Sequence, residues 1–341
     1  MNISILNSPD AASEDFILKM PNAKLEHTPA WSDMINRTFG HKTFYLVTRE
    51  GESIQGVLPL TCVQSRIFGN RMISQAFSNY GGILADNPDA AESLYNKSVE
   101  LAVENDCKSI EFRNIEPLNY GLNLCTDKIV LYLALTTDVE RLWQSFVPKV
   151  RNQVRKAQKS SIYAINGSME LLDDFYKVWT VRMHQLGTPC YPRKLFHNIL
   201  ATFPDDTLIF LVRLDKLTIG GAFVYCFQGF VQIRWAATLT EYNTLCPNNL
   251  LYWSVMRHFC SADASCFDFG RTTVGSGQHK FKKQWGAKQI QLNTQYWVRP
   301  GQKLSLARPD NPKYKNKVEI WKKLPLWFTR FAGPYISCNL P

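Results

Sequence analysis

The strongest constraint on the fold is an internal repeat of one strand–turn–strand pattern. Residues 46–56 and 211–221 both contain a Leu-Val pair that is followed seven residues later by Ile and nine residues later by Gly. Each pattern is followed by further strand signals, a helix pattern and a short apolar strand. The same elements in the same order predict two copies of one mixed α/β unit.

The fold class expected is therefore α/β, of the mixed α+β kind, with mixed sheets flanked by helices. The predicted organisation is an N-terminal unit over residues 1–137, a C-terminal unit over residues 138–300 and a basic tail rich in Pro and aromatic residues over 301–341. The alternative of two unrelated α+β segments remains open at this point.

Positive charge is concentrated in three stretches of the chain. Residues 141–159 and 271–288 contain Lys and Arg but no acidic residue, and residues 299–341 contain nine basic residues and two acidic ones. The formal net charge of the whole chain is +10. Such local charge favours polyanionic partners, namely phosphates, nucleic acid or an anionic membrane surface. The alternative is three solvated basic faces.

Several classes of protein are disfavoured by the sequence. The nine Cys are scattered without a C-x-x-C pair, which argues against a disulfide framework and a zinc site. The common nucleophile, zinc-protease and P-loop motifs are absent. The N-terminus lacks a signal-peptide pattern, and no apolar run reaches the ~18–20 residues of a membrane span. We therefore expect a cytoplasmic protein without a bound metal or resident cofactor.

The stretch from residue 267 to 287 contains the best candidate site. An apolar strand pattern carries Asp268, breaks at Gly270 and continues into Arg271 and a cluster of lysines. Direct acyl transfer suits this composition, because a Lys can stabilise an oxyanion and a carboxylate can hold or deprotonate an acceptor amine. An equally good interpretation of Asp268 is a strand-end residue that pairs with Arg271.

Two further basic segments are candidates for binding. Residues 148–159 predict a helix on which Arg151 and Arg155 lie one turn apart, an arrangement that favours a phosphate-facing helix over a solvated one. Residues 321–331 of the tail mix aromatic and cationic side chains. They suit either an anionic membrane surface or packing of Trp327 and Phe328 onto the body, and Pro325 argues against one continuous helix.

These segments carry a resemblance to a known family. Residues 267–271 and 281–287 resemble the C-terminal signature of FemAB-type transferases, and residues 150–156 resemble their central basic helix. Five further segments resemble the branch of that family associated with XrtA/PEP-CTERM exopolysaccharide systems. They are residues 39–45, 56–60, 80–86, 186–189 and 311–314.

The resemblance implies two tandem GNAT-like acyltransferase units that move an acyl or aminoacyl group to an amine or hydroxyl of a cell-envelope precursor related to peptidoglycan or exopolysaccharide. The implied acyl donor is acyl-CoA or aminoacyl-tRNA. The basic tail adds the alternative of a location at the inner face of the cytoplasmic membrane. The chain lacks the coiled-coil arm of some tRNA-using members, and residues 271–277 are one residue longer than the usual coenzyme A loop. Alternatives are an acyl-CoA-dependent N-acyltransferase acting on a sugar amine and a non-catalytic basic binding protein.

The resemblance also implies roles for individual residues. Lys282 matches the Lys that follows a Phe in the second unit and assists the transfer. The full candidate set is Lys282, Asp268 and Asp86 for catalysis, and Arg151, Arg155, Lys156, Tyr80, Arg271, Phe281 and Trp285 for substrate binding.

Overall fold

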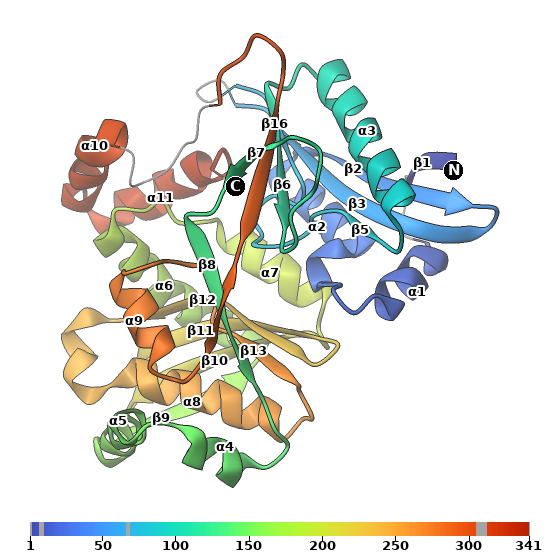
Figure 1. The fold of residues 1–341 in the computed structure, drawn as a ribbon. Helices are drawn as coiled ribbons and strands as arrows, with labels where there is room; N and C mark the ends of the chain where they lie inside the picture. The colour runs from blue at the N-terminus through green and yellow to red at the C-terminus, as the bar shows by residue number, and fades with distance from the viewer. Residues whose placement is uncertain (1, 7–9, 66–68, 305–311, 341) are drawn as a thin grey trace. The chain divides into compact units, whose positions relative to one another are not determined.

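The computed structural model describes residues 2–6, 10–65, 69–304 and 312–340, with side chains of the last range described from residue 316. The chain divides into two compact units. Unit 1 comprises residues 1–127, 291–308 and 335–341, and unit 2 comprises residues 128–290 and 309–334. Each unit contains one mixed sheet flanked by helices (Figure 1). Residues 305–311 of the expected tail lie outside the described residues.

The sheet of unit 1 has the strand order β1-β2-β3-β4-β6-β16-β7, and β5 pairs with β3. All described neighbours in this sheet are antiparallel except β4 and β6, which are parallel. The strands are β1 (Asn2–Leu6), β2 (Lys42–Glu50), β3 (Ser53–Val63), β4 (Arg71–Ile73), β5 (Leu84–Ala85), β6 (Ser109–Asn114), β7 (Asn123–Cys125) and β16 (Asn293–Val298).

Strand alternation gives the sheet of unit 1 two covered faces. Phe44 and Leu46 of β2 pack in one core cluster with Leu94 of helix α3 (Pro88–Glu104). Tyr45 points to the opposite face, where its hydroxyl donates to the carbonyl of His27. Helices α1 (Ala11–Lys19) and α2 (Pro29–Phe39) and the short 3-10 helix η1 (Leu25–His27) contact the sheet as well.

The sheet of unit 2 has the order β14-β8-β13-β12-β11-β10-β9, and β15 pairs with β8. Its one described parallel pair is β12 with β13. The strands are β8 (Lys128–Ala134), β9 (Ile162–Gly167), β10 (Thr207–Leu214), β11 (Leu217–Phe227), β12 (Phe230–Thr238), β13 (Cys266–Asp268), β14 (Thr272–Thr273) and β15 (Lys288–Gln291).

Helices cover both faces of the unit 2 sheet. Ala222 and Val224 of β11 pack in a core cluster with residues of α5 (Pro148–Lys159) and α8 (Pro247–Cys260). Phe223, between them, faces the other way and packs on aromatic rings of α6 (Leu172–Leu186) and α7 (Arg193–Thr202). The other helical segments of this unit are α4 (Val139–Ser145), η2 (Met169–Leu171), η3 (Thr240–Leu245) and α9 (Gly277–Lys283).

The predicted repeat is confirmed by the pairing of the strands. The β2–β3 and β10–β11 hairpins each contain one register shift, after Thr48 in the first and after Val212 in the second. In both sheets the parallel strand that follows (β6 or β13) pairs on its other edge with an antiparallel strand. The two sheets therefore have the same strand order and the same directions at their centres, as expected of two copies of one unit.

Two strands belong to a different compact unit from the one expected from a division at residues 137 and 300. β8 precedes residue 137 but pairs with β13 in the sheet of unit 2, and β16 follows the second set of helices but pairs with β6 in the sheet of unit 1. Each sheet is thus completed by a strand that lies beyond the expected boundary in sequence. Hydrophobic periodicity does not reveal this, because it reports the buried faces of a strand and not its neighbours.

Elements near both chain ends were missed by the sequence analysis. No strand or helix was predicted where β1 and α1 lie. The tail contains two helices, α10 (Pro312–Lys323) and α11 (Leu326–Ser337), which are separated at Pro325 as its missing N–H group predicts. None of the helices in the described ranges is long and apolar enough to cross a bilayer.

Candidate active site

Lys282 occupies the inward side of helix α9. The helix begins after Ser276, whose hydroxyl accepts from the N–H of His279. The side chain of Lys282 is 6% exposed, whereas Lys280 and Lys283 on the same helix are exposed. Its ammonium donates to the carbonyl of Gly270 at 2.7 Å and to that of Arg271 at 3.2 Å. Helix periodicity thus separates one buried lysine from its two neighbours.

Burial controls the charge of this lysine. Removal from water lowers the pKa of Lys282 from its usual 10.5 to about 8, because the charged form loses hydration. The Asp268 carboxylate opposes this shift, and the Arg271 guanidinium adds to it. Lys282 is therefore mostly protonated at neutral pH, but a small rise in pH is enough to remove its proton.

Asp268 lies at the end of β13 and has no exposed surface. One carboxylate oxygen accepts from the N–H of Gly270 at 2.8 Å, and the other accepts from the side-chain amide of Gln232 at 3.3 Å. Burial of Tyr252 raises the pKa of its hydroxyl well above the usual range, and the negative charge of Asp268 adds to this shift. Asp268 is therefore a buried negative charge that raises the pKa values of Tyr252 and Lys282.

Gly270 connects these two charged groups and requires its lack of a side chain. Its φ is +75°, and an added Cβ would lie 2.9 Å from the carbonyl oxygen of Ile233. The left-handed conformation and the close backbone contact both exclude larger residues. The turn that follows β13 can therefore present two carbonyl groups to one ammonium.

Phe281 and Trp285, which were predicted to bind substrate, lie in the aromatic packing behind Lys282. Phe281 makes an edge contact with Tyr252 at 5.1 Å between ring centroids. Trp285 is 1% exposed and packs against Phe146, which lies in the turn between α4 and α5. These rings fix the position of α9, and they tie the start of α5 to the end of that helix.

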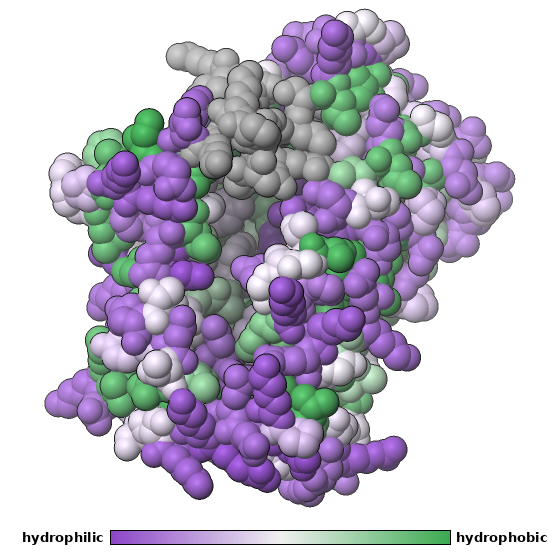
Figure 2. Space-filling view, turned by 60° about the vertical axis from the view of Figure 1, so that its left-hand side comes forward, coloured by the Kyte–Doolittle hydropathy of each residue, from purple (hydrophilic) through white to green (hydrophobic). Residues whose placement is uncertain are grey.

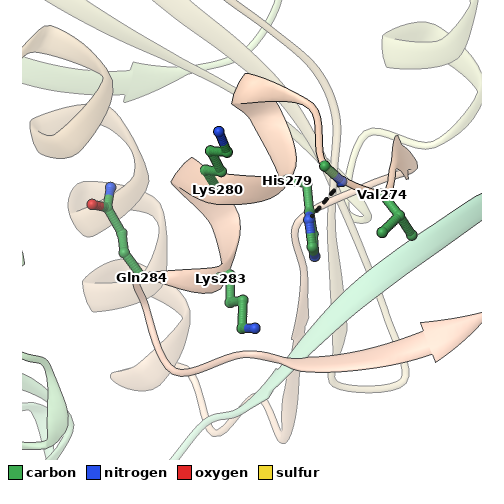
Figure 3. Close-up of a pocket in the computed structure, with 6 residues that line it drawn as sticks. Val274, His279, Lys280, Lys283 and Gln284 are labelled. Atoms are coloured by element: carbon green, nitrogen blue, oxygen red, sulfur yellow. Dashed lines mark hydrogen bonds between the residues drawn. The ribbon is translucent and has the colours of Figure 1, made fainter.

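A groove of about 470 Å³ borders α9 (Figure 3). Its lining includes the exposed ammonium-bearing side chains of Lys280 and Lys283 and the buried ring of His279. The Nδ1 atom of His279 accepts from the N–H of Gly275 at 3.1 Å, which assigns the ring proton of the neutral form to Nε2. The groove thus offers positive charge on the outer side of the helix that buries Lys282.

The cations predicted on the central basic helix lie on α5 in the same unit. Arg151 is half-buried and donates to the side-chain oxygen of Gln144 at 2.6 Å. The guanidinium of Arg155 lies 5.5 Å from the ring centroid of Trp143. Both arginines are therefore held by residues of α4, whereas Lys156 is exposed.

Tyr80 and Asp86 belong to unit 1. Tyr80 is 1% exposed and follows a loop in which Gln75 and Phe77 have positive φ angles of 57° and 61°. Asp86 lies between β5 and α3, is exposed and accepts from the side chain of Asn87 at 2.7 Å. The structure thus places Lys282, Asp268 and Arg271 together in unit 2, and these two residues in a loop region of unit 1.

Sequence reasoning missed the groups that hold the Tyr80 loop. Arg113 is 5% exposed, and its guanidinium donates to the carbonyls of Ser78 and Gln75 and to the Glu111 carboxylate. Glu26 accepts from the Ser78 hydroxyl at 2.9 Å. Charged residues that alternate with apolar ones in a predicted strand are the available signal for Arg113. Gln232, which contacts Asp268, has no comparable signal.

Comparison with known proteins assigns the type of domain in unit 2. Residues 144–283 match the family described as an acetyltransferase (GNAT) domain. The chain contains a GNAT acyltransferase domain. The match ends just after Lys282 and includes Asp268. Among the described residues, no group of three or more His, Cys, Asp or Glu side chains is arranged to hold a metal ion.

Solved structures of the same fold cover most of the chain. FemX is 15% identical, with a TM-score of 0.70, over 93% of this chain and 99% of that one. A C-terminal domain of a putative lysylphosphatidylglycerol synthetase from Agrobacterium fabrum is 12% identical, with a TM-score of 0.57, over 84% and 90%. A tandem GNAT protein from the clavulanic acid biosynthesis pathway is 12% identical, with a TM-score of 0.50, over 89% and 100%. No curated protein sequence matches the chain. These likenesses show that this acyltransferase has the tandem GNAT fold.

Proposed function

We propose that the protein transfers an acyl or aminoacyl group to an amine of a phosphate-bearing cell-envelope precursor, and that Lys282 stabilises the acyl oxygen during the transfer. The observation that supports this most is the anchoring of a buried lysine by two backbone carbonyls within the GNAT domain. An ammonium has three N–H bonds, and these carbonyls use two of them. The third is left for the oxygen on which negative charge develops.

The transfer itself needs little covalent machinery. The amine nitrogen attacks the acyl carbonyl carbon, and the C–S bond of a thioester or the C–O bond of an aminoacyl ester breaks as the amine loses a proton. A fixed ammonium beside the carbonyl oxygen lowers the barrier without forming a bond of its own. Asp268 is proposed to keep Lys282 protonated, because its charge raises the pKa of that lysine.

The binding roles follow the distribution of cations in unit 2. Two sets of cations are proposed to hold phosphate groups of the substrates. One is the exposed pair Lys280 and Lys283 on the outer side of α9, and the other is Arg151, Arg155 and Lys156 of α5. Arg271 contributes through its carbonyl and its nearby positive charge. Tyr80 and Asp86 of unit 1 are proposed for the acceptor side.

The donor is proposed to be acyl-CoA, the usual donor of GNAT domains, with aminoacyl-tRNA as the alternative. The fold shared with FemX and with a lysylphosphatidylglycerol synthetase domain supports a cell-envelope acceptor. An exopolysaccharide precursor of an XrtA/PEP-CTERM system remains part of this proposal on the strength of the sequence resemblance.

Mass spectrometry of reaction mixtures tests the proposal. Purified protein is offered nucleotide-linked and lipid-linked amino sugars with either acyl-CoA or aminoacyl-tRNA. Acylated product is expected with one donor. Lys282→Ala should lower kcat by about 10²–10³, the effect of losing one oxyanion donor. Lys288→Ala, which removes an exposed lysine of β15, is the control and should retain activity. Absence of product with both donors, together with steeply salt-dependent RNA binding, would support the non-catalytic alternative instead.

A further inference from the structure

The tail helices α10 and α11 are docked on unit 2 in a fixed orientation. Val318 of α10 packs against the turn at Gly187, where an added Cβ would lie 2.6 Å from its side chain. On α11, the guanidinium of Arg330 donates to the Thr180 hydroxyl at 2.9 Å, and the Thr329 hydroxyl lies 3.2 Å from the Nδ1 atom of His184. These contacts fix which side of each helix faces solvent.

The side of α11 that faces unit 2 is made of small residues. Thr329 is 3% exposed, and Gly333 is buried so closely against Cys190 that a Cβ would lie 2.8 Å from the sulfur atom. The opposite side carries large aromatic residues. Trp327 and Phe331, one turn apart, are 70% and 66% exposed. This arrangement reverses the one expected of a helix on a water-soluble body, where the large apolar residues face inward.

The outward apolar side continues beyond these two rings. Phe328 is 36% exposed, and Ile320 of α10 is 61% exposed. Packing of Trp327 onto the body was one alternative expected from the sequence, and it is wrong, because this side chain is exposed. In Figure 1, α10 and α11 lie on the left-hand side, which Figure 2 turns toward the viewer. Figure 2 shows hydrophobic residues among hydrophilic ones on that face.

The segment that carries the outward apolar residues is basic. Residues 312–334 contain six basic residues and one acidic residue. Lys323 at the end of α10 is exposed. The side chain of Lys322 packs beside Val318 at the Gly187 turn, and its ammonium pairs with the acidic residue, Glu319, at 2.8 Å. Exposed aromatic residues beside lysines suit an anionic bilayer surface, in which the rings enter the headgroup region and the ammonium groups contact phosphates.

We infer that the outward side of α10 and α11, formed by Ile320, Lys323, Trp327, Phe328 and Phe331, docks on an anionic lipid surface. A second copy of the chain is a poorer occupant, because pairing this side with itself would bring two basic segments together. Each helix has 12 residues, too few to span a bilayer, so the contact is peripheral. The inference does not depend on the proposed transfer chemistry.

Vesicle co-sedimentation tests the inference with the full-length protein. One set of vesicles is made of phosphatidylcholine alone, and the other also contains phosphatidylglycerol. The wild type should bind the second set, and Trp327→Ser/Phe331→Ser should lower its partition coefficient at least tenfold. Lys323→Glu should lower it several-fold for the anionic vesicles. The control Leu124→Ser/Leu217→Ser, which removes exposed apolar residues elsewhere, should bind as the wild type does.

A second measurement separates insertion from indirect effects on folding. Bromine-labelled lipids should quench part of the tryptophan fluorescence of the bound wild type. Trp327→Phe keeps an aromatic ring and should still bind, but the share of this quenching that comes from Trp327 should be lost. Equal vesicle binding by the wild type and the Ser variant would overturn the inference, as would no binding by the wild type. A wild-type molar mass that doubles with concentration, while that of the Ser variant does not, would also overturn it by identifying a contact between copies.

Discussion

The carbonyl oxygen of Gly270 lies 2.7 Å from the ammonium nitrogen of Lys282, and the N–H of the same glycine donates to Asp268 at 2.8 Å. One residue thus hydrogen-bonds both to a buried cation and to the carboxylate whose charge supports it. Neither charged group is left in the core without a polar partner. The turn after β13 is therefore a compact way to keep an ammonium protonated where water is largely excluded.

The pH dependence of catalysis should report the titration of Lys282. Its pKa is about 8, so the protonated form that stabilises an oxyanion is lost as the pH rises through that value. We expect kcat to fall above pH 8, with the residual rate of Lys282→Ala independent of pH in the same range. A wild-type rate that stays constant to pH 10 would contradict the role of the ammonium.

Replacement of Asp268 should move that pH profile. Asp268→Asn removes the negative charge that raises the pKa of Lys282, so the pKa of the lysine falls further and the decline in kcat begins at a lower pH. The pH–rate profiles of wild type and variant are compared. In a Lys282→Ala background the same substitution should leave the position of the profile unchanged. If Asp268 were instead the base that deprotonates the amine, the Asn variant would lose its rate at every pH.

Gly270 should tolerate no side chain. Gly270→Ala combines a left-handed conformation, which costs about 1–2 kcal/mol for a residue with a Cβ, with a 2.9 Å contact to a backbone oxygen. We therefore expect the free energy of unfolding in urea to fall by more than about 2 kcal/mol in total, which exceeds the conformational cost alone. Gly286→Ala is the matched control, since Gly286 has a φ of +80° and no atom within 4 Å of an added Cβ. Equal losses for both variants would show that the contact does not matter.

The sequence predicted the parts of the site that depend on periodicity and on spacing. Pro148–Lys159 was predicted as a helix with the bounds that α5 has, and the strand that carries Asp268 was predicted as well. Helix α9 was not, because Gly275 precedes it, Gly277 is its first residue and its 7 residues have no apolar period. Its start depends on the Ser276 cap, a signal that is common in turns too.

The environment of each lysine could not be predicted from the sequence. Lys280, Lys282 and Lys283 are equivalent as letters, and only helix α9 directs one of them inward. Phe281 and Trp285 were predicted to bind substrate, but aromatic residues serve packing and recognition equally well, and the choice depends on rings contributed by distant segments such as Phe146. Long-range pairing, as in β8 and β16, carries no local signal at all.

The stability of unit 1 at acid pH should depend on His27. Burial lowers the pKa of His27 from 6.5 to about 3, and the charge of Lys24 adds to this shift. Its Nδ1 atom accepts from the N–H of Lys24 at 2.9 Å, so the folded state binds the neutral ring. Between pH 6.5 and 3 the unfolded chain therefore binds more protons than the folded one. The contribution to stability is complete above pH 6.5 and is lost as the pH falls toward 3.

We expect the free energy of unfolding to fall by up to about 5 kcal/mol from this group, since each pKa unit corresponds to ~1.4 kcal/mol. Urea denaturation at a series of pH values measures it. His27→Gln keeps a hydrogen-bond acceptor but does not titrate, so its curve should be flatter than that of the wild type. His197→Gln removes an exposed histidine and should leave the curve unchanged. Parallel curves for wild type and His27→Gln would mean that His27 is protonated in the folded state. The neutral ring would then not be needed to keep η1, and with it the contact of Glu26 with Ser78 in the Tyr80 loop, in place.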